Sequence, residues 1–309
     1  MGQGYGFGKV ILFGEHFVVH GIPSIASAIS SKTTAVVEKK DTSGIEMHDE
    51  RPEIPGYKKE KLEQQEDSDK KIMEACGINT DGTGVKITLA GDLIAASGVG
   101  ASAASCAAIA RAISEEFSLG FDDDKINQIA YEGEKGYHGS PSGIDNTAAT
   151  YGGLIWFIKG DPNVMERMKT AKPLHIVMGN TGIVANTKAA VAGVAERKEK
   201  EPEKYSQIFE REKELVHEAR KALEEGDVEK VGKLMDENHK LLQEIEVSSP
   251  ELDMLVKLAK DNGALGAKMT GGGLGGYMYA LAPDQETQEK IAKLMEDKGF
   301  QVIKANVGG

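Results

Sequence analysis

The stretch that most constrains this chain is Gly-Val-Gly-Ala-Ser-Ala-Ala-Ser at residues 98–105. It leads directly into a segment whose apolar residues recur with the 3.6-residue period of a helix, at Cys106, Ile109, Ile113 and Phe117. Glycine lets a backbone bend tightly and approach an anion closely, and the start of a helix presents free N–H groups and the positive end of its dipole. The stretch therefore predicts a phosphate-binding loop.

Two better-known phosphate loops fit less well. A Walker A loop around the Gly-Lys pair at residues 8–9 fails because Gln3 stands where its first glycine belongs. Residues 98–103 fit the dinucleotide fingerprint with alanine in third place, but the acidic residues that follow, Glu115 and Glu116, lie inside the same helical pattern. A helix start made of small residues only for close packing is the structural alternative.

Composition narrows the possible functions. The chain has 309 residues, which is long for one domain, and its 40% hydrophobic and 28% charged residues are typical of a soluble globular protein. A formal net charge of −12 argues against nucleic-acid binding, although local lysines still permit an anionic small ligand. The sequence has neither the order of a signal peptide nor an apolar run of ~18 residues, so we expect a cytoplasmic protein without a membrane span. Cys76 and Cys106 are the only cysteines, which implies no disulfide framework and no Cys/His metal cluster.

Charged residues flank an apolar run near the N-terminus. Glycines punctuate the even positions from 2 to 8, and the run at residues 10–13 then predicts a buried strand. Lys9, Glu15 and His16 lie beside this strand. Buried ionisable groups need a partner or a purpose, so these three residues form a candidate site.

Two further polar features lie in the middle of the chain. Asp122, Asp123 and Asp124 are candidate caps of a predicted helix, and Glu134 lies near its end, where negative charge opposes the helix dipole. Glu134 therefore points to solvent or lies near a cation. Residues 137–146 form a glycine- and proline-rich turn that presents Asp145 and Asn146, although bonds to the local backbone explain such residues equally well.

The charged, proline-bracketed segment at residues 41–71 suggests an insertion or mobile flap, with a helix in its second half. A domain boundary is expected near Pro173, which divides the chain into residues 1–172 and 173–309. The second part predicts the order βαβ-βαβ with extra helices in the first crossover, an α/β sandwich.

A second glycine-rich stretch, Thr-Gly-Gly-Gly-Leu-Gly-Gly, lies at residues 270–276 between two strands of the second domain. A flexible hairpin would explain the glycines alone. Lys268 and Thr270 beside them suggest a second phosphate-facing loop. Two glycine loops in different domains then suggest that a nucleotide is held between them.

Three stretches together resemble the GHMP kinases, the family of galacto-, homoserine, mevalonate and phosphomevalonate kinases. Residues 8–21 resemble the first family motif, residues 98–104 the phosphate loop, and residues 268–276 the C-terminal glycine motif. Within the family, His16 after Gly-Glu and the run at residues 138–146 resemble the mevalonate kinases.

The resemblance implies an α+β fold, with a ribosomal-S5-like N-terminal domain and a ferredoxin-like C-terminal domain, often in a homodimer. It implies transfer of a phosphoryl group from ATP, with Mg²⁺, to the primary hydroxyl of mevalonate. Ser102 and Glu134 match the Mg²⁺ ligands, Asp145 the catalytic aspartate, and Lys9 the lysine near the reacting hydroxyl. The phosphate loop would contact ATP through Gly98, Val99, Gly100, Ala101, Ser102, Ala103 and Ala104. The residues expected at the substrate are Lys9, Glu15, His16, Asp145 and Thr270.

Two positions depart from the family pattern: Phe7 stands where proline is usual, and Ala101 where the first of two serines is common. The backbone donors and Ser102 remain, so neither change implies an inactive enzyme. Another kinase of this family, acting on phosphomevalonate or a sugar, is the nearest alternative, and a non-catalytic nucleotide-binding regulator on the same fold is another. The residues leave open whether Asp145 removes the proton early or chiefly orients the hydroxyl.

Overall fold

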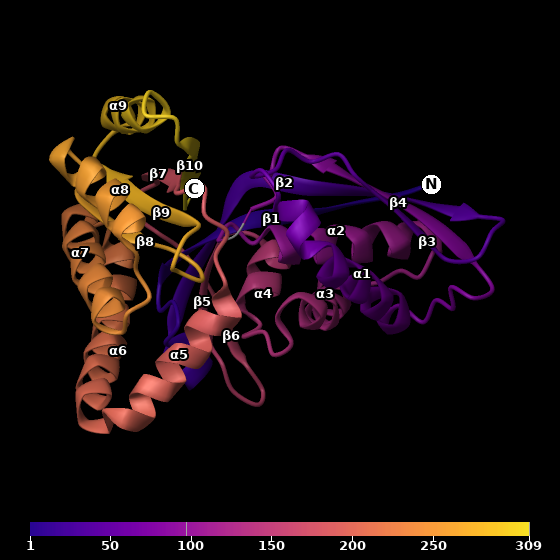
Figure 1. Cartoon of the computed structure of the whole chain (residues 1–309), viewed down its shortest axis with the longest axis horizontal. Coiled ribbons are helices and arrows are strands. Elements are labelled where there is room, and N and C mark those ends of the chain that lie inside the picture. The colour runs from indigo at the N-terminus through magenta and orange to yellow at the C-terminus, as the bar shows by residue number, and fades with distance from the viewer. Residues whose placement is uncertain (97, 309) are drawn as a thin grey trace. The chain divides into compact units, whose positions relative to one another are not determined.

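The structure is a computed structural model that describes residues 1–96 and 98–308 (Figure 1). The chain forms two compact units. The first unit consists of Met1–Lys9 and Ala28–Gly152, and the second of Val10–Ser27 and the chain from Gly153 onward.

Strands β1 (Gly2–Phe13) and β2 (Ser24–Lys40) each contribute residues to both units. The units therefore do not divide at the boundary predicted between residues 172 and 173. The reason is that β5 (Leu154–Ile158) pairs with residues 24–27 of β2, which places it in the second unit. As a boundary between family domains, the division at residue 172 stays a prediction.

The first unit packs helices against a sheet. Its strand β4 (Gly84–Gly91) alternates buried apolar side chains with partly exposed ones, and it pairs antiparallel with β2 and parallel with β3 (Ile45–Asp49). Asp122 begins α3 as predicted, because its side chain accepts a hydrogen bond from the Lys125 N–H. The helices are α1 (Tyr57–Ala75), α2 (Ala101–Glu116), α3 (Asp123–His138) and α4 (Ile144–Tyr151).

Strand β1 presents a glycine to helix α2 at every second position. A Cβ atom on Gly2, Gly4 or Gly6 would lie within 2.2 Å of a backbone oxygen of the helix. Only glycine allows strand and helix backbones to approach this closely. The strand therefore begins earlier than its apolar run predicts, and its glycines are part of it. The helix oxygens belong to alanines four residues apart on one face: Ala112, Ala108 and Ala104.

The charged segment at residues 41–71 is part of the folded unit. Arg51 is buried, and its guanidinium pairs with Asp49 at 2.7 Å. The same side chain donates to the backbone oxygen of Ala101 at 3.2 Å and to the Ser105 hydroxyl at 2.6 Å, both in α2. The interpretation as an insertion or flap is therefore wrong, whereas the helix predicted in its second half is present as α1.

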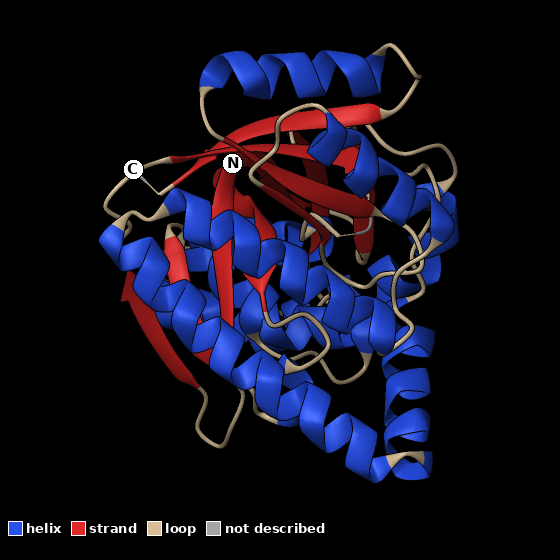
Figure 2. Cartoon of the chain, turned by 90° about the vertical axis from the view of Figure 1, so that its left-hand side faces the viewer, coloured by secondary structure: helices blue, strands red, loops and turns tan. Residues whose placement is uncertain are grey.

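The second unit contains a four-stranded antiparallel sheet with the order β10-β7-β9-β8, whose strands are labelled in Figure 1. Figure 2 draws the strands of the chain in red and its helices in blue. The predicted βαβ-βαβ order is confirmed, with α5 to α8 in the first crossover, as is the α+β fold class. The strands are β7 (Leu174–Asn180), β8 (Gly266–Met269), β9 (Tyr277–Ala282) and β10 (Gln301–Val307). The helices are α5 (Thr187–Lys200), α6 (Pro202–Glu225), α7 (Val228–Glu244), α8 (Pro250–Asp261) and α9 (Gln285–Glu296). Strand β6 (Val164–Met168), which pairs with β5, was not predicted.

The two faces of this sheet have different neighbours. A Cβ atom on Gly179 of β7 would contact Met295 of α9 at 2.8 Å and Leu255 of α8 at 3.7 Å, so both helices cover that face. Lys268 of β8 lies opposite Tyr279 of β9, and Tyr279 lies opposite Met178, the residue that precedes Gly179 in β7. Successive side chains of a strand point to opposite faces, so Lys268 and Tyr279 lie on the other face.

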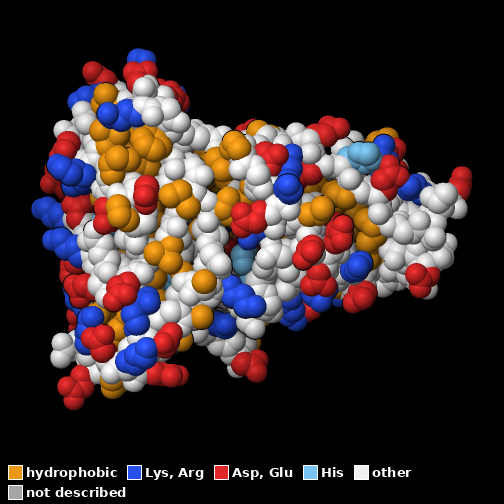
Figure 3. Space-filling view, in the orientation of Figure 1, with side chains coloured by type: hydrophobic (Ala, Val, Ile, Leu, Met, Phe, Trp, Pro, Cys, Tyr) orange, Lys and Arg blue, Asp and Glu red, His pale blue; other side chains and the backbone are white. Residues whose placement is uncertain are grey.

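No helix in the described part of the chain is long and apolar enough to cross a membrane. On the face shown in Figure 3, acidic side chains are interspersed with basic ones. The negative net charge is therefore not gathered into a single patch on this face.

Candidate active site

Lys9 and Asp145 form an ion pair in the first unit. Lys9 is 2% exposed, and its Nζ lies 3.0 Å from Oδ1 of Asp145, whose side chain is 29% exposed. Asp145 lies in the first turn of α4, which begins after Gly143 in the left-handed conformation (φ 96°). The positive end of the helix dipole favours a carboxylate at this position. The pair thus places an ionised, partly exposed carboxylate beside a buried ammonium group.

The glycine loop brings the start of α2 to the same lysine. The backbone N–H of Lys9 donates to Val99 O at 2.9 Å, and a Cβ atom on Gly100 would lie 2.6 Å from Lys9 Cγ. Gly100 has φ 70° and no side chain caps the helix that follows. The Ala104 N–H already donates to Gly100 O at 2.9 Å. The N–H groups of residues 101–103 are those that the first turn of an α-helix leaves without an intrahelical acceptor, and such groups can bind an anion.

Glu134 is buried beside the same group of residues. Its side chain is 1% exposed, and neither carboxylate oxygen has a hydrogen bond of standard geometry within the described residues. Burial raises the pKa of Glu134, and the charge of Asp145 raises it further, whereas three groups oppose the rise. Those three are His138, Ser102 and Lys9. Of the two interpretations of Glu134, exposure to solvent is wrong and a neighbouring cation is correct, because the charge of Lys9 acts on its carboxylate. His138 Nε2 lies 3.8 Å from Glu134 Oε2.

The residues of this group fit a magnesium ion. A buried carboxylate without hydrogen bonds is stabilised by a cation, and Ser102 at the second position of α2 adds a hydroxyl oxygen. The described residues contain no group of three or more His, Cys, Asp or Glu side chains suited to a metal. This agrees with Mg²⁺ sites in which one or two protein oxygens act together with phosphate oxygens and water.

In the second unit, the end of β1 is bound to the glycine-rich stretch at residues 270–276. The Ile11 N–H donates to Thr270 Oγ1 at 3.1 Å, and this hydroxyl donates back to Ile11 O at 3.0 Å. The Tyr279 hydroxyl donates to Leu12 O at 2.8 Å. Thr270 is 1% exposed and its hydroxyl is used twice, so it holds β1 in place and is not positioned to contact a substrate.

Lys268 does not face a phosphate, contrary to the prediction. Its side chain has no exposed surface, and Nζ contacts the carboxylate of Glu15 and donates to Met269 O at 2.9 Å. Burial lowers the pKa of Lys268, and Glu15 opposes that effect. The Glu15 side chain is equally buried, so we assign it a supporting role instead of direct contact with a substrate.

His16 is a neutral hydrogen-bonding group. It has a left-handed backbone (φ 62°), which is uncommon outside glycine and often marks functional sites. Burial lowers its pKa to about 4, with Lys268 and Arg197 acting in the same direction. The ring Nε2 lies 3.1 Å from Gly272 O, so Nε2 carries the proton and donates. Nδ1 is then an acceptor, and within the described residues it has no partner.

Arg51 and Glu212 are among the buried ionisable residues that the sequence analysis did not identify. Arg51, described above, holds the first turn of α2, and nothing in its charged segment distinguishes it. Glu212 is buried in α6, and its Oε2 accepts a hydrogen bond from Asn238 Nδ2 at 2.5 Å. A signal for Glu212 existed, because it lies at helical spacing between the apolar residues Ile208 and Val216.

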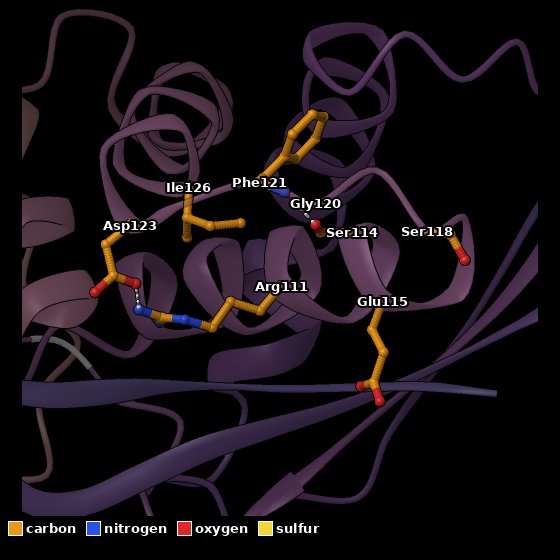
Figure 4. A pocket seen from close by; sticks show the side chains of 8 residues that line it. All are labelled: Arg111, Ser114, Glu115, Ser118, Gly120, Phe121, Asp123 and Ile126. Carbon is orange, nitrogen blue, oxygen red and sulfur yellow. Dashed lines mark hydrogen bonds and ion pairs between the residues drawn. The ribbon is translucent and has the colours of Figure 1, made fainter.

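A pocket of about 440 Å³ lies near the C-terminal end of α2, away from the phosphate loop at its start (Figure 4). Arg111 in this pocket donates to Asp123 at 2.7 Å, to Thr150 O at 2.9 Å and to Tyr5 O at 2.8 Å. The guanidinium of Arg111 therefore already donates hydrogen bonds to other residues of the chain. The pocket contains none of the predicted site residues: its lining is Arg111, Ser114, Glu115, Ser118, Gly120, Phe121, Asp123 and Ile126.

The chain is similar in sequence to proteins of one known family. Residues 69–153 match the GHMP kinases N terminal domain and residues 219–299 match GHMP kinases C terminal. The mevalonate kinase of Pyrococcus horikoshii is 34% identical over 92% of this chain and 89% of its own length. The mevalonate kinase of Arabidopsis thaliana is 28% identical over 98% of this chain and 96% of its own.

A solved structure shows the same similarity in three dimensions. The crystal structure of L. major mevalonate kinase in complex with R-mevalonate has a TM-score of 0.92 and 37% identity, covering 100% of this chain and 96% of that one. The chain therefore belongs to the GHMP kinase family, and the relatives named here are mevalonate kinases.

Proposed function

We propose that this chain transfers the terminal phosphoryl group of ATP, with Mg²⁺, to the C5 hydroxyl of mevalonate, producing 5-phosphomevalonate for isoprenoid synthesis. The observation that carries the chemistry is the Lys9–Asp145 pair at 3.0 Å, which shares its surroundings with Glu134 and Ser102. The choice of mevalonate is supported by the 37% identity to a kinase crystallised with R-mevalonate.

Lys9 and Asp145 have complementary roles at the acceptor hydroxyl. The Asp145 carboxylate accepts a hydrogen bond from the hydroxyl, which orients its oxygen and gives the proton a destination as transfer proceeds. The buried Lys9 ammonium is paired with Asp145 and would stabilise negative charge that develops on the hydroxyl oxygen. Little covalent chemistry is required of the protein in such a transfer, so the positions of these two groups determine the rate.

The start of α2 and the buried Glu134 serve the phosphate groups. The N–H groups of residues 101–103 form the first turn of α2 and would donate to phosphate oxygens, whose negative charge the helix dipole favours. Ser102 and Glu134 would hold Mg²⁺, which when bound offsets the charge on the transferred group. Ala101 keeps its backbone donor, so the missing serine hydroxyl does not remove the phosphate site.

His16 is suited to a hydroxyl group of the substrate. Its pKa of about 4 makes the ring neutral at pH 7, so it carries no charge to attract a carboxylate. Its Nδ1 lone pair accepts a hydrogen bond, and the Gly272 contact fixes this tautomer. We therefore assign His16 to recognition of a mevalonate hydroxyl.

The substrate is tested by measuring ATP consumption by the purified protein with Mg²⁺. Mevalonate, phosphomevalonate, galactose and homoserine are supplied in parallel. Selective turnover of mevalonate is the expected result. Turnover of another acceptor would keep the family and reject the substrate, whereas ATP binding without transfer to any of the four would favour a non-catalytic regulator.

The metal site is tested by Mg²⁺ titration of the activity. We expect Ser102→Ala and Glu134→Gln each to raise the Mg²⁺ concentration required for half-maximal activity by about tenfold or more, since each removes an oxygen ligand. Glu132→Gln is the control, because Glu132 lies on the same helix in an exposed pair with Lys135. An unchanged Mg²⁺ requirement in both site variants would reject this pair of ligands.

The assembly and location of the chain are also proposals. We expect a homodimer in the cytoplasm, as the family resemblance implies. Sedimentation equilibrium of the purified protein measures the first, and a monomer at micromolar concentration would contradict it.

A further inference from the structure

A cluster of three ionisable side chains lies within the second unit. Glu15 follows β1, Lys268 belongs to β8 and Glu212 belongs to α6. The side chains of Glu15 and Lys268 have no exposed surface, and Glu212 is 0% exposed. Lys268 supports Glu15, but the roles proposed above leave Glu212 unused.

The cluster holds two carboxyl groups and one ammonium group. If all three were ionised, a net negative charge would remain on fully buried side chains, which is strongly unfavourable. Lys268 is ion-paired with Glu15. In the described structure Glu212 has no ion pair, and its Oε2 accepts from the neutral amide of Asn238. The contacts therefore leave Glu15 as the ionised carboxyl and Glu212 as the one that holds a proton.

Electrostatics of the surroundings supports this distribution of charge. Burial raises the pKa of Glu212 to about 8, and the neighbouring charge of Glu15 contributes to the rise. Three groups oppose it: Lys268, Asn238 and the backbone N–H of Gly14.

Other titratable groups nearby do not change charge above neutral pH. His239 of α7 accepts at Nδ1 from the Met269 N–H at 3.4 Å, and burial lowers its pKa. His16 has a pKa of about 4. The Arg197 guanidinium, which acts on His16 from α5, stays charged at every relevant pH. Burial also lowers the pKa of Lys268, and the charge of Glu15 opposes that effect. Glu212 is thus the carboxyl group of this cluster expected to titrate between neutral and alkaline pH.

We propose that Glu212 is a positioning residue for the organic substrate: as an uncharged acid it supports residues 14–16 beside the Lys268–Glu15 pair, and loss of its proton weakens mevalonate binding. The inference rests on the proposed function, because His16 is the group taken to contact mevalonate. The cause is direct. An ionised Glu212 repels Glu15 and competes for Lys268, and both effects displace the turn that carries His16.

The test compares the KM for mevalonate between pH 6 and pH 9 in the wild type and in Glu212→Gln. The neutral amide reproduces the uncharged acid and cannot release a proton. We expect the wild-type KM to rise about tenfold between pH 7 and pH 9, as one proton of pKa about 8 is lost, and the KM of Glu212→Gln to stay at its low value. The KM for ATP should show no such rise in either protein.

Glu210→Gln is the matched control, because Glu210 lies on the same helix with its side chain 65% exposed. It should reproduce the wild-type rise. Glu212→Met, also uncharged and of similar length, replaces Glu212→Gln if that variant does not fold. A wild-type KM that is constant with pH, or a rise that persists in the uncharged variants, would overturn the inference.

Thermal unfolding supplies a readout that does not depend on turnover. The unfolded chain releases the Glu212 proton near pH 4.5, whereas the folded chain holds it until about pH 8. Wild-type stability therefore falls as pH rises between these values, and the advantage in Tm of Glu212→Gln over the wild type should grow from pH 5 to pH 8. A constant difference in Tm would contradict the inference. If the wild type fails to phosphorylate mevalonate, the proposed function fails, and this measurement still decides the charge of Glu212.

Discussion

Asp145→Asn is expected to lower kcat for mevalonate phosphorylation by about 10² to 10⁴-fold, the range typical of a lost general base or orienting carboxylate. Asparagine keeps the shape of the side chain and removes both its charge and its ability to accept the hydroxyl proton. Lys9 would also lose the partner that lies 3.0 Å away. Steady-state kinetics with saturating ATP and Mg²⁺ measures the effect.

The control for this prediction is Asp81→Asn, an exposed carboxyl in a loop of the same unit. Its kcat should equal that of the wild type. The unfolding temperature of Asp145→Asn should fall, because the buried Lys9 keeps an amide oxygen as acceptor but loses its opposite charge, so kcat is measured below that temperature. Near-normal turnover by a folded Asp145→Asn protein would remove Asp145 from the mechanism.

Gly4→Ala and Gly6→Ala are each expected to lower the free energy of unfolding by about 3 kcal/mol or more, at the upper end of the cost of overpacking. The added Cβ atom would lie 2.2 Å from a backbone oxygen of α2. A backbone oxygen within a helix has no rotamer to change, so the strand and helix must move apart. Thermal or denaturant unfolding measures the loss.

Gly82→Ala is the matched control, since nothing lies within 4 Å of its added Cβ atom and its backbone is not left-handed. Its stability should stay equal or rise slightly, because alanine restricts the unfolded chain. If Gly4→Ala and Gly6→Ala match this control in stability, the close approach of β1 to α2 is not required for folding.

Local patterns in the sequence predicted those features whose causes lie within a few residues. Asp122 caps α3 because its side chain accepts a hydrogen bond from the backbone N–H three residues later. The buried and exposed positions of β4 follow from alternation. Lys9, Glu134 and Asp145 could be named from family motifs, and the structure places them together in the first unit.

Features that depend on distant partners were not predictable in this way. Lys268 was expected to face phosphate, yet its partner Glu15 lies 253 residues earlier in the chain. The guanidinium of Arg51 donates a hydrogen bond to the hydroxyl of Ser105, which lies 54 residues later in the chain. A charged residue is predicted to be exposed unless a residue of opposite charge lies nearby in the sequence. Buried pairs between distant residues can therefore be identified only from the three-dimensional structure. The strand was predicted to begin only at residue 10 for the same reason. The helix that requires the glycines at positions 2, 4 and 6 lies about 100 residues later in the chain.

The bond between Ile11 and Thr270 also determines when the protein can finish folding. The two residues are 259 positions apart, so β1 leaves the ribosome long before its partner strand is made. At ordinary rates of translation this delay lasts roughly 10 to 50 s. During that time residues 10–13, which are all buried in the finished protein, lack the side chains of Thr270 and Tyr279 that hydrogen-bond to Ile11 and Leu12. We therefore expect this apolar run to stay exposed on the nascent chain, as the kind of surface that chaperones protect, until residue 279 has emerged.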